Sequence, residues 1–166
     1  SDGANGPGVR VSLFVSGCTH HCKECFNPET WDFSFGSPFG EEQIQQILKL
    51  LDRSYIRGLS LLGGEPFEPQ NQEAVLELVR RVRAQLPQKD IWCYSGYLFE
   101  ELAKGNVGEH SRELLEQLDV LVDGPFVLEQ KDLGLQFRGS ANQRIIRVPP
   151  SLKAGTVCLW QDRTIE

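Results

Sequence analysis

Three cysteines lie close together near the start of the chain, at Cys18, Cys22 and Cys25. Three thiolates at these spacings can surround one face of a cubic 4Fe-4S cluster, whereas an ordinary electron-transfer cluster takes four cysteine ligands. One iron would then have no protein ligand. An iron of this kind can bind a small molecule, so the spacing predicts a cluster that does chemistry on a bound ligand.

A second candidate feature is the turn Gly63-Gly64-Glu65-Pro66, which follows a short apolar stretch. Glycines let backbone groups approach a ligand closely, and the carboxylate of Glu65 can pair with an ammonium group. Alone the turn is a weak signal, because glycine pairs are common in turns and a following Glu often serves only as a charge at a helix N-terminus. Beside the cysteine segment, it predicts a place for the amino group of the bound molecule.

The alternative for the cysteines is a structural zinc site, with His20, His21 or a remote cysteine as the fourth ligand. Zinc sites usually combine two paired ligand clusters, and this sequence has one. Cys93 falls in a predicted strand and Cys158 lies near the end of the chain, where we expect both to behave as small buried apolar residues. The pattern therefore favours iron and sulfur over zinc.

Alternating strand and helix patterns are expected to position these residues. Residues rich in β-branched, aromatic and leucine side chains predict strands at 9–16, 59–62, 90–94, 120–122, 145–148 and 156–160. Apolar residues at helical spacing predict helices with buried faces at 44–51, 75–86 and 114–118, and 27–40 reads as a loop. Such βα repeats favour a mostly parallel sheet with functional loops at the carboxyl ends of its strands.

The length of the chain limits the architecture. Its 166 residues suit one domain, 1–166, and are too few for eight full βα units. We therefore expect an α/β fold, a partial (open) βα barrel with a mostly parallel sheet and abbreviated helices. Trp92 and Trp160 are expected in its core, and Pro149-Pro150 is the one linker-like pair that we note.

Several polar residues in the second half of the chain have two readings. Asp123-Gly124 ends a predicted strand on the side of the expected site, yet Asp-Gly is also a common turn pair. Arg138 and 142–144 could contact a bound cofactor or a partner, or could form a polar surface loop. The sequence leaves both choices open.

The charge balance bears on partners and location. Lys and Arg total 17 against 23 acidic residues, for a net charge of -6 and a pI of about 5.1, so the overall field repels polyanions and argues against nucleic acid. No apolar run reaches the roughly 18 to 20 residues that span a bilayer. Clustered cysteines in a chain of this kind suit a reducing compartment, and we expect a cytoplasmic protein without membrane contact.

The spacing Cys18-x3-Cys22-x2-Cys25, together with the glycine turn, resembles the radical S-adenosylmethionine (SAM) superfamily. More narrowly, the chain resembles the anaerobic (class III) ribonucleotide reductase activating proteins. The segments that carry this resemblance are 6–10, 15–18, 25–31, 122–124 and 138–143. One departure from the wider superfamily is Glu24, where an aromatic residue often precedes the third cysteine; here the aromatic follows as Phe26.

The resemblance implies two cofactors and a set of residues that hold them. The cluster ligands would be Cys18, Cys22 and Cys25. SAM would chelate the open iron through its amino and carboxylate groups. The backbone along its adenine would come from Glu24, Cys25 and Phe26, and the residues holding its amino group would be Gly63, Gly64 and Glu65.

The resemblance also implies an activity. Reduction of the cluster, by a low-potential donor such as flavodoxin or ferredoxin, would cleave SAM to a 5'-deoxyadenosyl radical, which would take a hydrogen atom from a glycine of the partner reductase. No general base is needed, since the cofactor carries the hard step, and we assign no catalytic role to His20, His21 or His110. The alternatives are an activase of another glycyl-radical enzyme, such as pyruvate formate-lyase, and a non-catalytic metal-binding interaction module.

Overall fold

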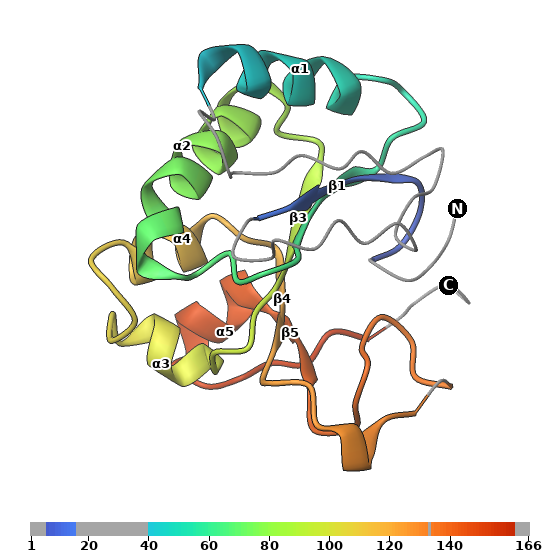
Figure 1. Cartoon of the computed structure of the whole chain (residues 1–166), viewed down its shortest axis with the longest axis vertical. Helices are drawn as coiled ribbons and strands as arrows, with labels where there is room; N and C mark the ends of the chain where they lie inside the picture. The colour runs from blue at the N-terminus through green and yellow to red at the C-terminus, as the bar shows by residue number, and fades with distance from the viewer. Residues whose placement is uncertain (1–5, 16–39, 133, 162–166) are drawn as a thin grey trace.

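A single five-stranded sheet runs through the molecule (Figure 1). The computed structural model describes residues 6–15, 40–132 and 134–161. In spatial order, which is also chain order, the strands are β1 (Arg10–Phe14), β2 (Gly58–Leu62), β3 (Asp90–Tyr94), β4 (Val120–Asp123) and β5 (Arg144–Arg147). The first four are parallel and β5 is antiparallel to β4. The prediction of an α/β fold with a mostly parallel, open sheet is confirmed.

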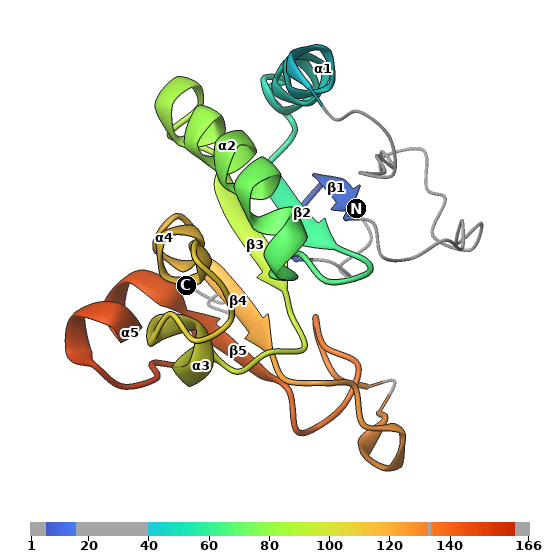
Figure 2. The same ribbon diagram turned by 60° about the vertical axis from the view of Figure 1, so that its left-hand side comes forward.

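Helices cover one face of this sheet (Figure 2). They are α1 (Glu41–Leu51), α2 (Pro69–Gln85), α3 (Phe99–Ala103), α4 (Ser111–Glu116) and α5 (Val148–Ala154), and a 3-10 helix, η2, spans Leu128–Gln130. Three of the helices have seven residues or fewer, as the prediction of abbreviated helices requires. Among the described residues, no helix is both long and apolar enough to cross a membrane.

The amphipathic pattern explains how α1 and α2 form and pack. The buried residues of α1 are Ile44, Ile47, Leu48 and Leu51, the face expected from their spacing. The backbone N–H of Gly40 donates to the Gln43 side chain at 2.8 Å, which satisfies one donor at the start of the helix. α2 begins at Pro69, whose missing N–H costs nothing in a first turn. Its buried face includes Val75, Leu78, Val79 and Val82.

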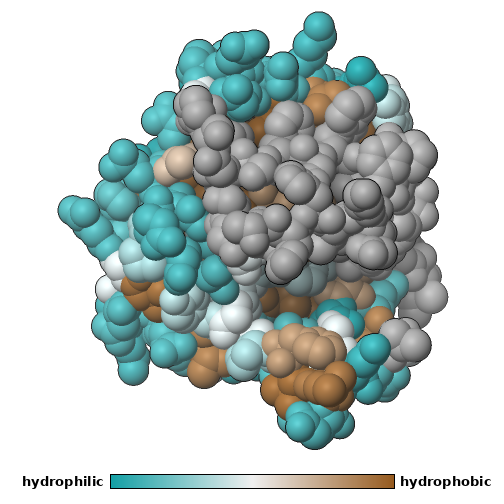
Figure 3. Space-filling model, viewed as in Figure 1, coloured by the Kyte–Doolittle hydropathy of each residue, from teal (hydrophilic) through white to brown (hydrophobic). Residues whose placement is uncertain are grey.

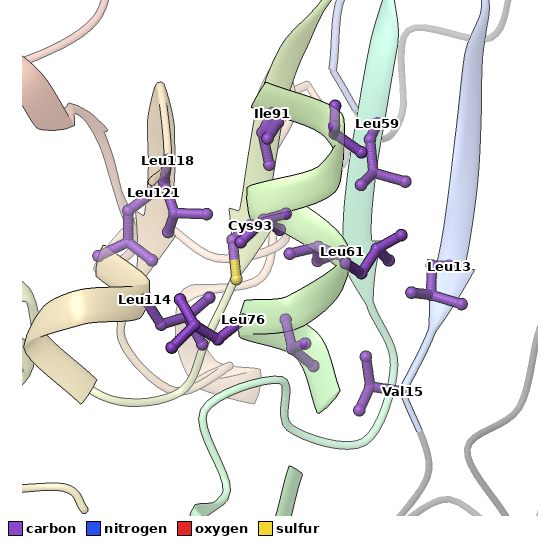
Figure 4. Close-up of a cluster of buried hydrophobic side chains, with 14 of the residues drawn as sticks. Leu13, Val15, Leu59, Leu61, Leu76, Ile91, Cys93, Leu114, Leu118 and Leu121 are labelled. Carbon is purple, nitrogen blue, oxygen red and sulfur yellow. The ribbon is translucent and has the colours of Figure 1, made fainter. Parts of the chain in front are cut away.

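The two faces of the sheet carry different cores because successive strand residues point to opposite sides. The main apolar core faces the helices and includes Leu13, Leu61 and Cys93 from the strands and Leu76 and Leu114 from the helices (Figure 4). On the other face, a smaller cluster contains Trp92, Val120, Val122 and Phe137, with the partly buried Trp160 against it. The rings of Trp92 and Trp160 meet edge to face, with their centroids 5.1 Å apart.

A buried arginine ties the amino ends of the first three strands together. Arg10 is 5 % exposed, and its guanidinium donates to the Ser60 hydroxyl (2.8 Å), to the Leu59 carbonyl (3.0 Å) and to the Asp90 carboxylate. It also donates to the Pro7 carbonyl at 3.1 Å. A buried cation needs such complete pairing, so this network explains the 6–10 segment noted in the sequence.

Two parts of the sequence-based prediction are wrong. Pro149 and Pro150 are not a linker: they lie in the first turn of α5, where a missing N–H is tolerated. Residues 156–160 were expected to form a strand but make only an isolated bridge, between Ile146 and Leu159. The helix α3 was not expected, because five residues are too few to show a periodicity.

Candidate functional site

The carboxyl ends of the first four strands lie at one level of the sheet. In the strand register, Phe14 pairs with Leu62 and Tyr94 pairs with Val122. The next residues along the chain therefore form a row at this edge: Val15, Gly63, Ser95 and Asp123. Ligands bind most often at this edge of parallel sheets, which is where the sequence placed the site.

The predicted cluster ligands and adenine contacts belong to the segment that follows β1. Cys18, Cys22, Glu24, Cys25 and Phe26 lie within 16–39, outside the described residues, so their roles stay predictions. The described chain stops at Val15, whose N–H donates to the Leu62 carbonyl at 2.9 Å. The end of β1 thus lies beside the end of β2.

The glycine turn packs closely against the end of β1. Gly63 has φ +72°, and a Cβ at this position would lie 2.9 Å from Cδ1 and 3.0 Å from Cβ of Phe14. Only glycine fits both the left-handed backbone and the close contact. Gly63 and Gly64 are exposed, so their backbone is open to a ligand at the end of β2.

The Glu65 carboxylate is already bound by three donors from the protein. Oε2 accepts the Ser95 hydroxyl at 2.7 Å and the Phe67 N–H at 3.1 Å, and Oε1 accepts the Gly96 N–H at 2.8 Å. Burial raises the pKa of Glu65, against the lowering effect of these hydrogen bonds. An ionised carboxylate offers about four acceptor sites, so one remains for the ammonium group that the sequence predicted here.

Three residues after β3 belong to this site and were not recognised from the sequence. Besides Ser95 and Gly96, the Tyr97 hydroxyl donates to Glu68 Oε1 at 2.7 Å. This bond raises the pKa of Tyr97 to about 12, so the hydroxyl stays protonated at neutral pH. A Ser-Gly pair directly after a buried strand was the available signal, because small residues at a strand end allow close contacts between loops.

Asp123, which the sequence left as either a residue of the site or a turn residue, has a structural role. Its side chain is fully buried and accepts the Phe99 N–H (2.8 Å) and two donors of Arg144, Nε at 3.0 Å and Nη2 at 2.5 Å. Arg144 also pairs with the exposed Glu100 at 2.7 Å, and both carboxylates raise its pKa. Asp123 therefore joins β4, β5 and α3 and is more than an exposed turn residue.

The loop between β4 and β5 is held by its own polar side chains. Arg138 donates to the Gln143 carbonyl at 2.7 Å, Asn142 donates to the Pro125 carbonyl at 2.8 Å, and the Gln143 side chain donates to the Gly124 carbonyl at 3.1 Å. These bonds match the surface-loop reading of Arg138 and 142–143, whereas Arg144 lies in β5 and pairs with Asp123. Contact of these residues with a cofactor or partner stays a prediction.

The same loop carries exposed apolar side chains. Phe126 is 52 % and Leu128 is 69 % exposed. The loop projects beyond the sheet in Figure 2, and Figure 3 shows hydrophobic surface at this end of the molecule.

Two further cysteines and one histidine fall within the described residues. Cys93 is fully buried in the main core, as expected, and burial raises its pKa well above the usual range. Cys158 is only partly buried, so the expectation of a buried residue is wrong there. The Nδ1 atom of His110 lies 3.1 Å from Oε1 of Glu113. Across the described ranges, no three His, Cys, Asp or Glu side chains gather in a way that could hold a metal ion.

Comparisons with known proteins give the family. A family model described as "4Fe-4S single cluster domain" matches residues 4–146. The chain is 49 % identical over 148 residues to the anaerobic ribonucleoside-triphosphate reductase-activating protein of Vibrio cholerae, covering 88 % of this chain and 92 % of that protein. The chain belongs to the family of anaerobic ribonucleoside-triphosphate reductase-activating proteins.

Other members of this reductase-activating family match over a similar span. The Haemophilus influenzae protein is 47 % identical over 149 residues, covering 89 % of this chain and 93 % of its own. The Escherichia coli protein is 44 % identical over 144 residues, covering 86 % and 90 %. No solved structure matches the chain significantly.

The residue types of the predicted site suit the cofactors that the resemblance implies. The matched cluster domain contains both the cysteine segment and the glycine turn. Three thiolates are soft donors suited to iron and sulfur. Gly63 keeps side-chain atoms away from the end of β2, and Glu65 retains an acceptor site beside it.

Proposed function

We propose that this chain is a radical SAM enzyme that activates an anaerobic ribonucleotide reductase by forming a glycyl radical on it. The observation that carries the proposal is the position of Gly63, Gly64 and Glu65 at the carboxyl end of β2, beside the end of β1 from which the cysteine segment departs. Membership of the reductase-activating family supports the partner. The 4Fe-4S domain match supports the metal centre.

In this proposal the protein binds the cluster and SAM, orients them and shields them from water. The cluster would be held by Cys18, Cys22 and Cys25. Glu24, Cys25 and Phe26 would supply the backbone beside the adenine, and Gly63, Gly64 and Glu65 would hold the methionine amino group. The remaining acceptor site of the Glu65 carboxylate supports this last role.

When bound, the cluster and SAM would supply the radical chemistry: one electron would cleave the sulfonium bond of SAM to methionine and a 5'-deoxyadenosyl radical, which would take a hydrogen atom from a glycine of the partner. A low-potential donor such as flavodoxin or ferredoxin supplies that electron. No side chain of the protein moves a proton in this scheme, so positioning is its main contribution.

The wider setting is part of the proposal. We propose a single radical SAM domain over 1–166 with an open, partial βα barrel, supported by one continuous sheet and one main core. Clustered thiols suit a reducing, cytoplasmic location. The net charge of -6 argues against a nucleic acid as partner.

The first test is metal analysis of protein prepared without oxygen. We expect iron and sulfide with an electron paramagnetic resonance signal that changes when SAM is added; zinc in place of iron would end the proposal. Cys22→Ala should lose the cluster while the domain stays folded, and Cys158→Ala, the matched control, should keep the parent iron content.

The second test concerns the partner. Glycyl radical formation should be measured on the anaerobic reductase and on pyruvate formate-lyase, each mixed with reduced activase and SAM. We expect a radical on the reductase alone. A radical on pyruvate formate-lyase alone would reassign the partner, and no 5'-deoxyadenosine from either mixture would leave a non-catalytic interaction module.

A further inference from the structure

The Glu65 carboxylate joins two turns that follow neighbouring strands. It lies in the β2–α2 turn, and two of its three donors come from the β3–α3 turn: the Ser95 hydroxyl at 2.7 Å and the Gly96 N–H at 2.8 Å. Hydrogen bonds to an ionised acceptor are short and about twice as strong as neutral ones. The two turns are therefore held at a fixed separation by one carboxylate.

Ser95 is the centre of this arrangement. It is 6 % exposed, its hydroxyl accepts the Tyr97 N–H at 3.0 Å, and its own N–H donates to the Val122 carbonyl of β4 at 3.0 Å. The residue thus contacts β4 through its backbone and the β2–α2 turn through its side chain. Its hydroxyl has both its donor and one acceptor position in use, which fixes its direction.

A second bond joins the same two turns. The Tyr97 hydroxyl donates to Glu68 Oε1 at 2.7 Å, three residues beyond Glu65. Because it lies nearer the surface than the Ser95 bond, we expect it to contribute less. Space also limits the β3–α3 turn, since a Cβ on Gly96 would lie 3.4 Å from Glu65 Oε1.

We propose that Ser95 is a positioning residue for the cofactor: its hydroxyl fixes the Glu65 carboxylate so that the one unused acceptor direction faces the methionine ammonium of SAM. The inference rests on the proposed function. Groups held in place before a ligand arrives bind it more tightly, because less freedom is lost on binding. Ser95 acts through Glu65 and the turn, without touching the reacting atoms.

The binding test compares four anaerobically reconstituted proteins: the parent, Ser95→Ala, Ser95→Thr and Ser151→Ala. Ser151 is the matched control, since it is fully buried and its hydroxyl donates to the Arg147 carbonyl at 2.6 Å, away from the carboxyl edge. SAM affinity is measured by calorimetry, with iron content and unfolding midpoint as checks on each protein.

We expect Ser95→Ala to keep its iron and to bind SAM about tenfold more weakly, because it loses one hydrogen bond that orients a charged group. Ser95→Thr, which keeps the hydroxyl, should recover most of that loss, and Ser151→Ala should bind like the parent. Parent-like affinity in Ser95→Ala overturns the inference, as does an equal loss in Ser151→Ala. If Ser95→Ala does not fold, Tyr97→Phe takes its place, with about threefold weaker binding expected and no change as the contradicting result.

A measurement without cofactors separates this inference from the proposed function. Carboxyl carbon shifts report the pKa of Glu65 by NMR, and Ser95→Ala should raise that pKa because a bond that lowers it is lost. An unmoved pKa would show that the hydroxyl does not control the carboxylate. Failure of the parent to bind SAM would instead overturn the proposed function.

Discussion

Replacing Asp123 by Asn tests the network at the ends of β4 and β5. Asp123 is fully buried and accepts three hydrogen bonds, one from Phe99 and two from Arg144. Asn has the same shape but no charge and one acceptor oxygen. With that oxygen at the Oδ2 position, the Phe99 and Nη2 bonds persist, while the amide nitrogen faces the Nε–H of Arg144, donor against donor.

The expected cost follows from these contacts. Losing one charge-assisted bond costs about 1.5 to 3 kcal/mol, and unpairing a buried ion costs up to about 3 to 5 kcal/mol. The Arg144 side chain is 32 % exposed and keeps Glu100, so water and the second carboxylate reduce the penalty. We expect the free energy of unfolding to fall by about 2 to 3 kcal/mol.

Glu100→Gln is the matched control, because it removes the other carboxylate from the same guanidinium. Glu100 is 51 % exposed, and exposed ion pairs contribute less than about 1 kcal/mol. Urea unfolding followed by circular dichroism at pH 7, in low and high salt, measures both variants. The effect of Glu100→Gln should shrink in salt, and that of Asp123→Asn should persist. A cost below about 1 kcal/mol for Asp123→Asn, or one equal to its control, would refute the reasoning.

Three further predictions concern the glycine turn and two titrating groups. Gly63→Ala should lower the free energy of unfolding by about 2 to 4 kcal/mol, because the new Cβ is strained at a positive φ and also meets the Phe14 side chain. Gly105→Ala has the same kind of strain, at φ +75°, but no atom within 4 Å of the new Cβ, so it should cost about 1 to 2 kcal/mol. Urea unfolding measures both variants. The pKa of Glu65 is raised in the folded state, so above about pH 4 the unfolded chain releases this proton before the folded protein does. The parent should therefore lose stability relative to Glu65→Gln as the pH rises, until the pH passes the folded pKa. Urea unfolding at a series of pH values measures this difference. The Arg81 hydrogen bond lowers the pKa of Glu41 to about 2, so Arg81→Ala should return it toward 4.5 in an NMR titration.

Each of these has a contradicting result. Equal costs for the two glycine variants would mean that the contact with Phe14 does not matter. A stability difference between parent and Glu65→Gln that grows in the parent's favour with pH would reverse the sign argued from burial. An unchanged Glu41 in Arg81→Ala would place the cause of its shift elsewhere.

Much of the fold was predictable where one local signal was strong. The strand at 90–94 was predicted with its observed bounds, and the apolar spacing from Ile44 to Leu51 marked the buried face of α1. Residues 148–154 were misjudged because Pro149-Pro150 suits both a linker and a first helical turn. Only packing against the sheet, through the buried Val148 and Ser151, decides between them.

In the candidate site, too, some residues were predictable from a local sequence pattern and others were not. Gly63, Gly64 and Glu65 were predictable because a Gly-Gly-Glu run after an apolar strand is a local pattern. Ser95 was not, since its partner Glu65 lies 30 residues away and is chosen by the strand register. The Ser-Gly pair after β3 indicates a close contact between loops, but a single sequence does not identify Glu65 as the partner, because that pairing depends on β2 and β3 lying side by side.

The reversal of β5 places the last helix far from the glycine turn. The N–H of Val148, at the start of α5, donates at 2.9 Å to the carbonyl of Asp119, at the amino end of β4. Lys153 is exposed on this helix. A dye or a surface tether attached there would sit at the opposite rim of the sheet, so optical and immobilised assays can follow ligand capture without obstructing it.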